Sequence, residues 1–154
     1  RTLVEYFQDQ EEPTKILMFG DHQPSVEQEF LDKAYGVTQD GMTMEQYMGK
    51  YKTPFVIWAN YPLPQEGPEV TSLNFLGLYL LHYAGIQGTQ YQDYLWQLQQ
   101  QLPAITFVGY VDRAGQAYSH LETNDYTSLI QDYQCLQYNN LFGGTNRRSA
   151  AFDP

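Results

Sequence analysis

The sequence has one cysteine, few basic residues and no long apolar run, and each shortage excludes a class of protein. Cys135 has no second cysteine among the 154 residues, so the chain has no internal disulfide and no cysteine-based zinc cluster. We expect Cys135 to be a small buried apolar side chain. Eight Lys and Arg stand against 18 Asp and Glu, and the resulting net charge of -10 repels a nucleic-acid backbone. The sequence therefore predicts no nucleic-acid partner.

The apolar runs are too short to cross a membrane. The longest span residues 16–19, 55–59 and 76–81, whereas a spanning helix needs about 20 residues. The first residues lack the basic and apolar regions of a secretory signal, so we expect no such signal in this stretch. Hydrophobic residues make up 42% of the chain, which excludes a disordered segment. The composition predicts a globular protein with one core.

Two continuous apolar runs predict the central strands. Lys15–Phe19 is closed by Gly20, and Pro54–Ala59 is closed by the turn residues of 60–64. A strand without polar alternation is typical of a parallel sheet whose two faces are covered. Since helical patterns separate the runs, we expect a right-handed parallel crossover between them. The predicted fold class is α/β.

Helical spacing and capping residues predict the remaining elements. The first segment, Thr2–Gln10, is amphipathic, and we interpret the chain as starting in mid-domain. Further helices are expected from Ser25 to Gly36, Thr43 to Tyr51, Thr71 or Ser72 to Ala84, Thr89 to Leu102 with a solvated glutamine face, and Tyr126 to Tyr138 after a capping Asp125. Residues 105–111 and 117–121 predict a β-hairpin at a sheet edge. We find no interdomain linker before a polar tail, 145–154, that is expected to fray.

The most informative stretch is Phe19-Gly-Asp-His-Gln-Pro-Ser25, directly after the first apolar strand. Ligand sites in open α/β sheets lie beyond the carboxyl ends of the strands. Gly20 allows the backbone to bend, so that Asp21 and His22 can point toward one site. A carboxylate and an imidazole suit Zn²⁺ or Mn²⁺. The residues alone support a polar turn about equally well, and two ligands do not make a complete site.

Other polar residues give weaker signals. His82 and His120 have no carboxylate or cysteine at ligand spacing, so we expect surface or structural roles. No Gly-x-Ser-x-Gly elbow, Walker A loop or Gly-x-Gly-x-x-Gly motif is present, which argues against serine hydrolases and nucleotide-binding proteins. Fourteen Tyr and two Trp also fit a non-catalytic module that binds cell-wall sugars through stacking. Most of the Tyr fall at core-facing helical positions, which favours packing.

Four segments resemble one known family, the C-terminal part of the lipoteichoic acid synthase-like sulfatases of the alkaline phosphatase superfamily. They cover nearly the whole chain in the expected order: Phe19-Gly-Asp-His-Gln-Pro-Ser25, Tyr51-Lys-Thr-Pro-Phe-Val-Ile-Trp-Ala-Asn-Tyr61, Thr71-Ser-Leu-Asn-Phe75 and Tyr133-Gln-Cys-Leu-Gln-Tyr-Asn-Asn-Leu-Phe142. The Gly-Asp-His motif is moderately specific by itself, and its combination with the second segment makes chance agreement improbable.

The resemblance implies an α/β/α sandwich and an enzyme that is anchored at the extracytoplasmic face of the cell membrane. Such enzymes transfer phosphoglycerol, or a related phosphoryl group, from an anionic lipid to an acceptor such as a glycopolymer. They use a threonine nucleophile and a divalent metal, commonly Mn²⁺, with Zn²⁺, Mg²⁺ and Ca²⁺ as alternatives. By the motif match, Asp21 and His22 correspond to two metal ligands, and Gln23 is expected to line the substrate pocket.

The family's nucleophile and its remaining metal ligands lie in an N-terminal half that this chain lacks. We therefore interpret residues 1–144 as the C-terminal portion of a sulfatase-like catalytic domain that is inactive alone and carries part of the metal site. The missing half is the expected partner, and self-association through an exposed sheet edge is an expected consequence of its absence. Sulfatase and phosphotransferase both stay open, because the nucleophile that distinguishes them is outside the chain.

Overall fold

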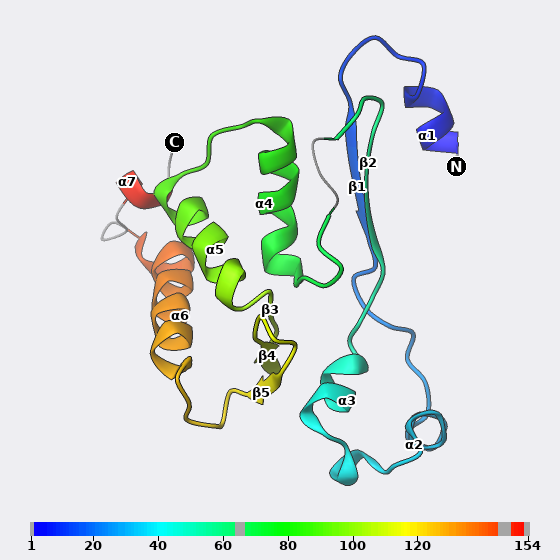
Figure 1. Cartoon of the computed structure of the whole chain (residues 1–154), viewed down its shortest axis with the longest axis vertical. Coiled ribbons are helices and arrows are strands. Elements are labelled where there is room, and N and C mark those ends of the chain that lie inside the picture. Colours follow the sequence, from blue (N-terminus) through cyan, green and yellow to red (C-terminus); the bar gives the residue numbers. More distant parts are fainter. Residues whose placement is uncertain (1, 64–66, 145–148, 153–154) are drawn as a thin grey trace. The chain divides into compact units, whose positions relative to one another are not determined.

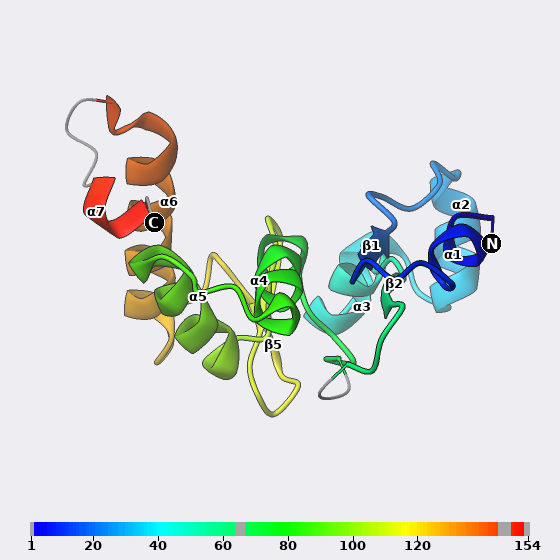
Figure 2. The ribbon, with the colours of Figure 1, turned by 90° about the horizontal axis from the view of Figure 1, so that it is seen from above.

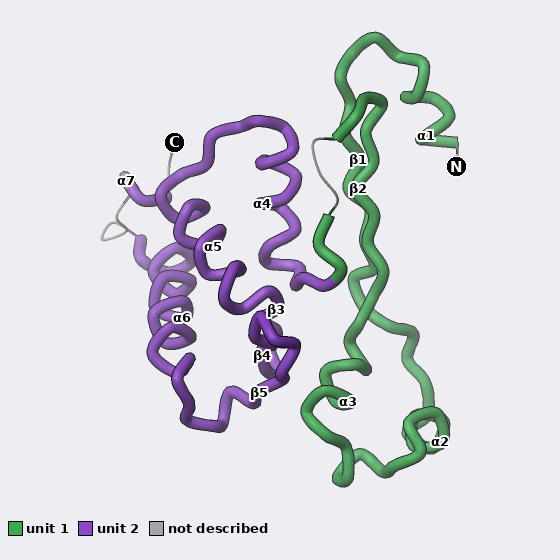
Figure 3. The backbone as a smooth tube through the Cα atoms, in the orientation of Figure 1, with its two compact units in different colours: residues 1–69 green, residues 70–154 purple. Residues whose placement is uncertain are grey.

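The computed structural model describes residues 2–63, 67–144 and 149–152, which form two compact units. Unit 1 comprises residues 1–69 and unit 2 comprises residues 70–154 (Figure 3). Helices and small sheets occur in both, so the predicted α/β class is confirmed. That residues 1–144 belong to one catalytic domain stays a prediction.

Unit 1 is built around a pair of strands with short helices at both ends (Figure 1). In chain order it contains α1 (Thr2–Phe7), β1 (Lys15–Phe19), α2 (Gln28–Tyr35), the 3₁₀ turn η1 (Gln39–Gly41), α3 (Met44–Gly49) and β2 (Phe55–Ala59). Helix α3 starts as expected, because the Thr43 side chain accepts a hydrogen bond from the Gln46 N–H. In return, the side-chain oxygen of Gln46 accepts the Thr43 N–H. Helix α2 starts later than expected. Its N-cap is Glu27, and Ser25 lies outside the helix, two residues before this N-cap.

The predicted parallel sheet is wrong in this chain, because β1 and β2 are antiparallel. Lys15 lies opposite Ala59, and Phe19 lies opposite Phe55. A parallel pair needs a connection that returns along the whole strand. Here α2 and α3 lie beyond the Phe19 end, and the chain enters β2 at that same end (Figure 1). The strands are not covered on both faces either, since Met18 is 66% exposed and Val56 is 50% exposed.

Asn60 closes the other end of the strand pair. Its side-chain oxygen accepts a hydrogen bond from the Thr14 N–H at 2.9 Å. Its side-chain nitrogen lies 2.9 Å from the carbonyl oxygens of Gln10 and Glu12 and 3.2 Å from that of Phe7. The Asn60 side-chain amide therefore connects the segment after α1 to the end of β2 by hydrogen bonds.

Unit 2 packs helices beside a small three-stranded antiparallel sheet (Figure 2). It contains α4 (Leu73–Ala84), α5 (Gln90–Gln101), β3 (Ala104–Ile105), β4 (Gly109–Val111), β5 (Ala117–Ser119), α6 (Thr127–Phe142) and α7 (Ser149–Phe152). The predicted hairpin corresponds to β4 and β5, and β3 adds a third strand to it. Helix α7 replaces part of the tail that was expected to fray, and residues 145–148 and 153–154 of that tail lie outside the described residues.

Several helix boundaries in unit 2 follow the local rules, although the side chain of Ser72, the N-cap of α4, makes no capping hydrogen bond. Gly85 ends α4 with a left-handed φ of 66°, and Thr89 forms a capping box with Gln92 at the start of α5. Helix α6 begins at Thr127, and Asp125 does not cap it. The side chain of Asn124 takes that place in the turn, because its oxygen accepts the Tyr126 N–H at 2.9 Å.

The core of the molecule lies in unit 2. Phe75, Leu98, Leu102 and Tyr110 are almost completely buried. Gln99 was expected on the solvated face of its helix, but it is buried, and its side-chain oxygen accepts the Tyr79 hydroxyl at 2.8 Å. The hydrogen bond explains how an amide can occupy this position.

A buried carboxylate organises the turn between β4 and β5. Asp112 Oδ1 accepts the N–H groups of Ala114 and Gln116 at 2.9 Å, and Oδ2 accepts the hydroxyls of Tyr118 at 3.0 Å and Tyr126 at 3.5 Å. Burial raises the pKa of the Asp112 carboxyl, but these four hydrogen bonds outweigh burial and hold the pKa below its usual value. The turn is therefore built around an ionised side chain.

Candidate metal-binding loop

The loop after β1 carries the candidate site residues. Two hydrogen bonds fix its first residue, since the Gly20 N–H donates to the Pro54 carbonyl at 3.0 Å and the Thr53 hydroxyl donates to the Gly20 carbonyl at 2.7 Å. A Cβ at position 20 would lie 3.0 Å from the Thr53 Cβ, so the loop passes where only glycine fits without displacement. Thr53 thereby positions the residues that follow Gly20.

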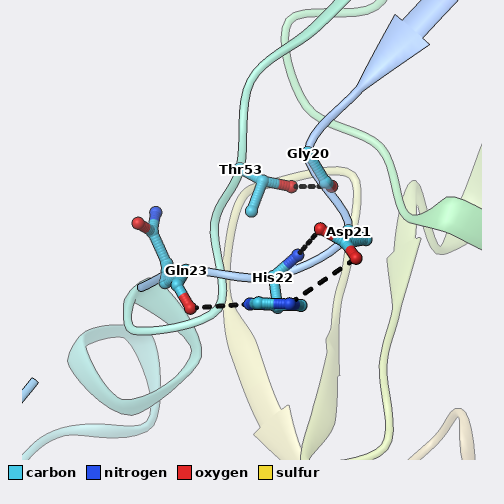
Figure 4. Close-up of polar contacts among 5 residues, drawn as sticks. All are labelled: Gly20, Asp21, His22, Gln23 and Thr53. Carbon is cyan, nitrogen blue, oxygen red and sulfur yellow. Dashed lines mark hydrogen bonds and ion pairs between the residues drawn. The ribbon is translucent and has the colours of Figure 1, made fainter. Parts of the chain in front are cut away.

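Asp21 and His22 point toward each other beyond the end of β1 (Figure 4). Asp21 Oδ1 accepts the His22 backbone N–H at 3.0 Å, and this bond leaves Oδ2 directed at the imidazole, 3.6 Å from Nε2. Both side chains are open to solvent, with 81% of Asp21 and 78% of His22 exposed. The two consecutive residues present a carboxylate oxygen and a ring nitrogen on one side of the loop.

The His22 ring is oriented by the backbone. Its Nδ1 lies 2.9 Å from the Gln23 carbonyl oxygen. Because a carbonyl can only accept, the ring donates from Nδ1 in this contact, and in the tautomer that is protonated there Nε2 is the nitrogen that can bind a cation beside Asp21. Ligating histidines in proteins commonly hold their other nitrogen on a carbonyl in this way.

The Gln23 side chain does not join Asp21 and His22. In Figure 4 it points away from them, and its amide nitrogen donates to the Lys52 carbonyl. Gln23 therefore anchors the loop to the segment before β2, and its expected place in a substrate pocket stays a prediction. The structure brings together two of the segments that carry the resemblance, residues 19–25 and 51–61. Sequence reasoning missed Thr53 as a positioning residue, although it lies in the second segment.

The donor set at this loop fits part of a metal centre. A cation bonded to a carboxylate oxygen and an imidazole nitrogen at about 2.1 Å each spans donor atoms up to about 4.2 Å apart, and the Asp21–His22 separation is 3.6 Å. Within the described ranges, no group of three or more His, Cys, Asp or Glu side chains converges on one point. The chain therefore supplies two candidate ligands.

The other candidate residues lie elsewhere. His82 stacks on Trp96 with ring centroids 4.5 Å apart, and His120 Nε2 lies 2.7 Å from the Thr106 carbonyl. Both have structural contacts, although His120 Nδ1 is buried without a hydrogen-bond partner among the described residues. Cys135 is exposed, so its predicted burial is wrong. It lies on α6, one of whose faces is solvated.

The family of the chain follows from comparison with known proteins. A family model described as Sulfatase matches residues 1–86, which is more than half of the chain and includes the candidate metal-binding loop. The chain belongs to the sulfatase family, and the predicted resemblance to sulfatases is confirmed. Enzymes of the sulfatase superfamily are generally metal-dependent.

A relative extends the similarity into unit 2. The "Putative cyclic beta-1,2-glucan modification protein" of Rhizobium meliloti (strain 1021) is 23% identical over 147 residues, which is 93% of this chain and 23% of that protein. The chain thus spans about a quarter of the length of this relative. No solved structure matches the chain.

Proposed function

We propose that this chain is the C-terminal portion of the catalytic domain of a cell-envelope enzyme of the sulfatase family, to which it contributes Asp21 and His22 as metal ligands. The enzyme transfers phosphoglycerol, or a related phosphoryl group, from an anionic lipid to a glycopolymer. The observation that carries the proposal is the geometry of the loop, where a carboxylate oxygen and the lone-pair nitrogen of an oriented imidazole lie 3.6 Å apart after β1.

Asp21 Oδ2 and His22 Nε2 would hold the divalent cation, with Mn²⁺ as our proposal and Zn²⁺, Mg²⁺ or Ca²⁺ as alternatives. When bound, the cation neutralises charge on the transferred group and lowers the pKa of a coordinated hydroxyl. The chain's own contribution is orientation. The His22 Nδ1–H bond to Gln23 fixes the ring, and the Thr53–Gly20 hydrogen bond fixes the start of the loop.

The nucleophile and the remaining ligands come, in this proposal, from an N-terminal half of the same domain. The exposed apolar residues of the strand pair support this partner. Met18, Phe19 and Val56 are 66%, 47% and 50% exposed, and apolar strand surfaces of this kind are normally covered by neighbouring strands or helices. In a chain without that half, the same strands would pair with a second copy.

The acceptor and the cellular location are proposed from the name of the relative. The relative's name mentions a cyclic β-1,2-glucan, and we propose a glucan of this class as the acceptor. An envelope glucan and an anionic lipid meet at the extracytoplasmic face of the membrane. Among the helices of the described residues, none has the length and apolarity of a membrane span. An anchor would therefore come from other parts of the protein.

The test uses the full-length protein that contains this chain. Asp21→Ala and His22→Ala should each lower bound manganese and reduce phosphoglycerol transfer to β-1,2-glucan more than about 100-fold, because even outer-shell changes at metal sites cost 10–100-fold. Asp40→Ala, an exposed carboxylate on η1, is the matched control and should leave both quantities unchanged. Full metal content and full transfer in the Asp21→Ala protein would overturn the proposal.

A further inference from the structure

Unit 2 contains a cavity of about 310 Å³ that is separate from the metal-binding loop. Residues of α4, α5, α6 and α7 line it, and the sulfatase match ends at residue 86, before three of these four helices begin. The match to the glucan-modification relative, by contrast, covers 93% of the chain. The cavity is therefore a feature that the family assignment leaves without a role.

The chemistry of the lining selects a class of ligand. None of its described residues is charged, so neither a metal ion nor a phosphate finds a counter-charge there. The polar part consists of amides and hydroxyls, including Asn74, Gln92 and Asn140, and the rest is aliphatic or aromatic. A neutral ligand that carries many hydroxyl groups on an apolar ring framework matches this mixture.

Several of these polar groups have unused hydrogen-bonding capacity. Gln92 Oε1 accepts the Thr89 N–H at 2.7 Å, but within the described residues its amide nitrogen has no acceptor. The side-chain amide of Asn140 and the hydroxyl of Tyr91 likewise have no hydrogen-bond partner in the described part of the chain. Donors and acceptors held on helices without partners are available to a ligand.

An aromatic pair forms one wall of the cavity. The Tyr91 and Phe152 rings lie 4.9 Å apart and are tilted by 49°, and both line the cavity. Burial raises the pKa of Tyr91 to about 12, so its hydroxyl stays neutral at ordinary pH. The apolar C–H face of a sugar ring packs on aromatic rings, and its hydroxyls bond to neutral polar groups of this kind.

Gly77 provides a second, independent observation. It lies in the middle of α4 and lines the cavity, and no heavy atom lies within 4 Å of the Cβ that it lacks. Its φ is not in the left-handed region. A helical glycine costs about 1 kcal/mol relative to alanine, and here neither packing nor backbone conformation requires it. Gly77 is exposed, so its missing side chain leaves this side of the cavity open to solvent and to a ligand.

We infer that this cavity binds one hexopyranose unit of a neutral glucan, and that Gly77 leaves the space for it. The inference rests on the proposed function, because it names the binding site for the acceptor of that reaction. Unit 2 thus holds the glucan, whereas the metal-binding loop of unit 1 belongs to the reacting centre.

The test measures binding of the β-1,2-linked glucose disaccharide to the 154-residue chain by calorimetry and by NMR titration. We expect saturable binding whose shifted signals include Gly77, Tyr91 and Asn140. Gly77→Leu should weaken binding at least tenfold without lowering the melting temperature, since leucine is a better helix former than glycine. Ala84→Leu places the same leucine side chain at an exposed position of α4 outside the cavity, and this protein should bind normally.

If Gly77→Leu does not fold, Asn140→Ala takes its place and should weaken binding with an unchanged spectrum elsewhere. Absence of saturable sugar binding, or binding that both cavity variants retain, overturns the inference. Shifts produced instead by a fatty acid would identify an apolar ligand and also overturn it. Sugar binding without transfer by the full-length protein would refute only the proposed function. If the full-length Gly77→Leu protein transfers the group with an unchanged KM for glucan, this result would refute only the role of the cavity as the glucan-binding site.

Discussion

The two units of this chain differ in where their apolar side chains lie. Among the residues that the structure describes, 14 of the 15 buried apolar side chains lie in unit 2, and Met48 is the one in unit 1. The strands of unit 1 nevertheless consist of two continuous apolar runs. Unit 2 therefore has a core of its own, whereas the unit that carries Asp21 and His22 is tied together by hydrogen bonds such as those of Asn60. The need of unit 1 for a partner stays part of the proposal, and the comparison provides a way to test it.

The difference predicts two separate unfolding transitions. Each unit holds one tryptophan, Trp58 in β2 and Trp96 in α5, so Trp96→Phe and Trp58→Phe proteins report on unit 1 and unit 2 respectively. In urea, the fluorescence of Trp96 should report a cooperative transition with a free energy of unfolding of about 5 kcal/mol or more. The fluorescence of Trp58 should change gradually, because the free energy of unfolding of unit 1 is near zero. Coincident transitions would contradict the comparison.

Shortening an apolar side chain should destabilise unit 2 much more than unit 1. Leu98 is 1% exposed, and Leu98→Ala should destabilise unit 2 by about 2–5 kcal/mol through the cavity it leaves. Val56→Ala is the counterpart on the strand pair. Because Val56 is 50% exposed, its replacement should change stability by no more than about 0.5 kcal/mol. The urea midpoints of the two variants measure both effects, provided that the dependence of the unfolding free energy on urea is unchanged. Equal losses of stability would show that unit 1 has a core after all.

The Asp112 turn should make unit 2 sensitive to acid. Its folded pKa is lowered, so the carboxylate stabilises the fold above the unfolded value of about 3.9 and loses this effect as the pH falls through the lower folded value. Asp112→Asn places an amide opposite two tyrosine hydroxyls and should cost about 1–3 kcal/mol at pH 7. The cost should shrink below pH 4. Asp125→Asn, at an exposed position, is the control.

The smallest expected effect is a loss of folding stability at alkaline pH. Burial raises the pKa of Tyr91 to about 12, above the unfolded value of about 10. Stability that is complete below pH 10 is therefore lost as the pH rises from 10 to 12. Melting temperatures over this range should fall less steeply for Tyr91→Phe than for the unchanged chain. An identical slope in the two proteins would show that Tyr91 ionises freely in the folded state.

Local structure could be predicted from the sequence wherever neighbouring residues determine it. The capping boxes at Thr43 and Thr89 and the helix end at Gly85 follow from short-range geometry. The direction of β2 could not be predicted, because the apolar run at 55–59 fits a parallel or an antiparallel pairing with β1. Only the path of the connection between the two strands determines which pairing forms. Gln99 was misplaced since its partner, the Tyr79 hydroxyl, lies 20 residues away.

The candidate site shows the same limit. Asp21 and His22 could be predicted as candidate ligands from residue chemistry and their place after a strand, and the structure places their carboxylate oxygen and ring nitrogen 3.6 Å apart. Thr53 could not be identified, because its contact with Gly20 spans 33 residues and depends on the antiparallel register. The cavity beside Gly77 was also missed, since it needs four helices that are distant in the sequence.

The most direct test of the metal-binding loop is paramagnetic broadening of the ¹⁵N-labelled chain by Mn²⁺. Two ligands supply only part of a coordination shell, so we expect no affinity tighter than about micromolar, corresponding to about -8 kcal/mol. At substoichiometric Mn²⁺ the amides of residues 20–23 should broaden first, and Asp21→Ala or His22→Ala should abolish this effect while Asp40→Ala retains it. Broadening centred on other carboxylates, or unchanged in the Asp21→Ala chain, would contradict the account.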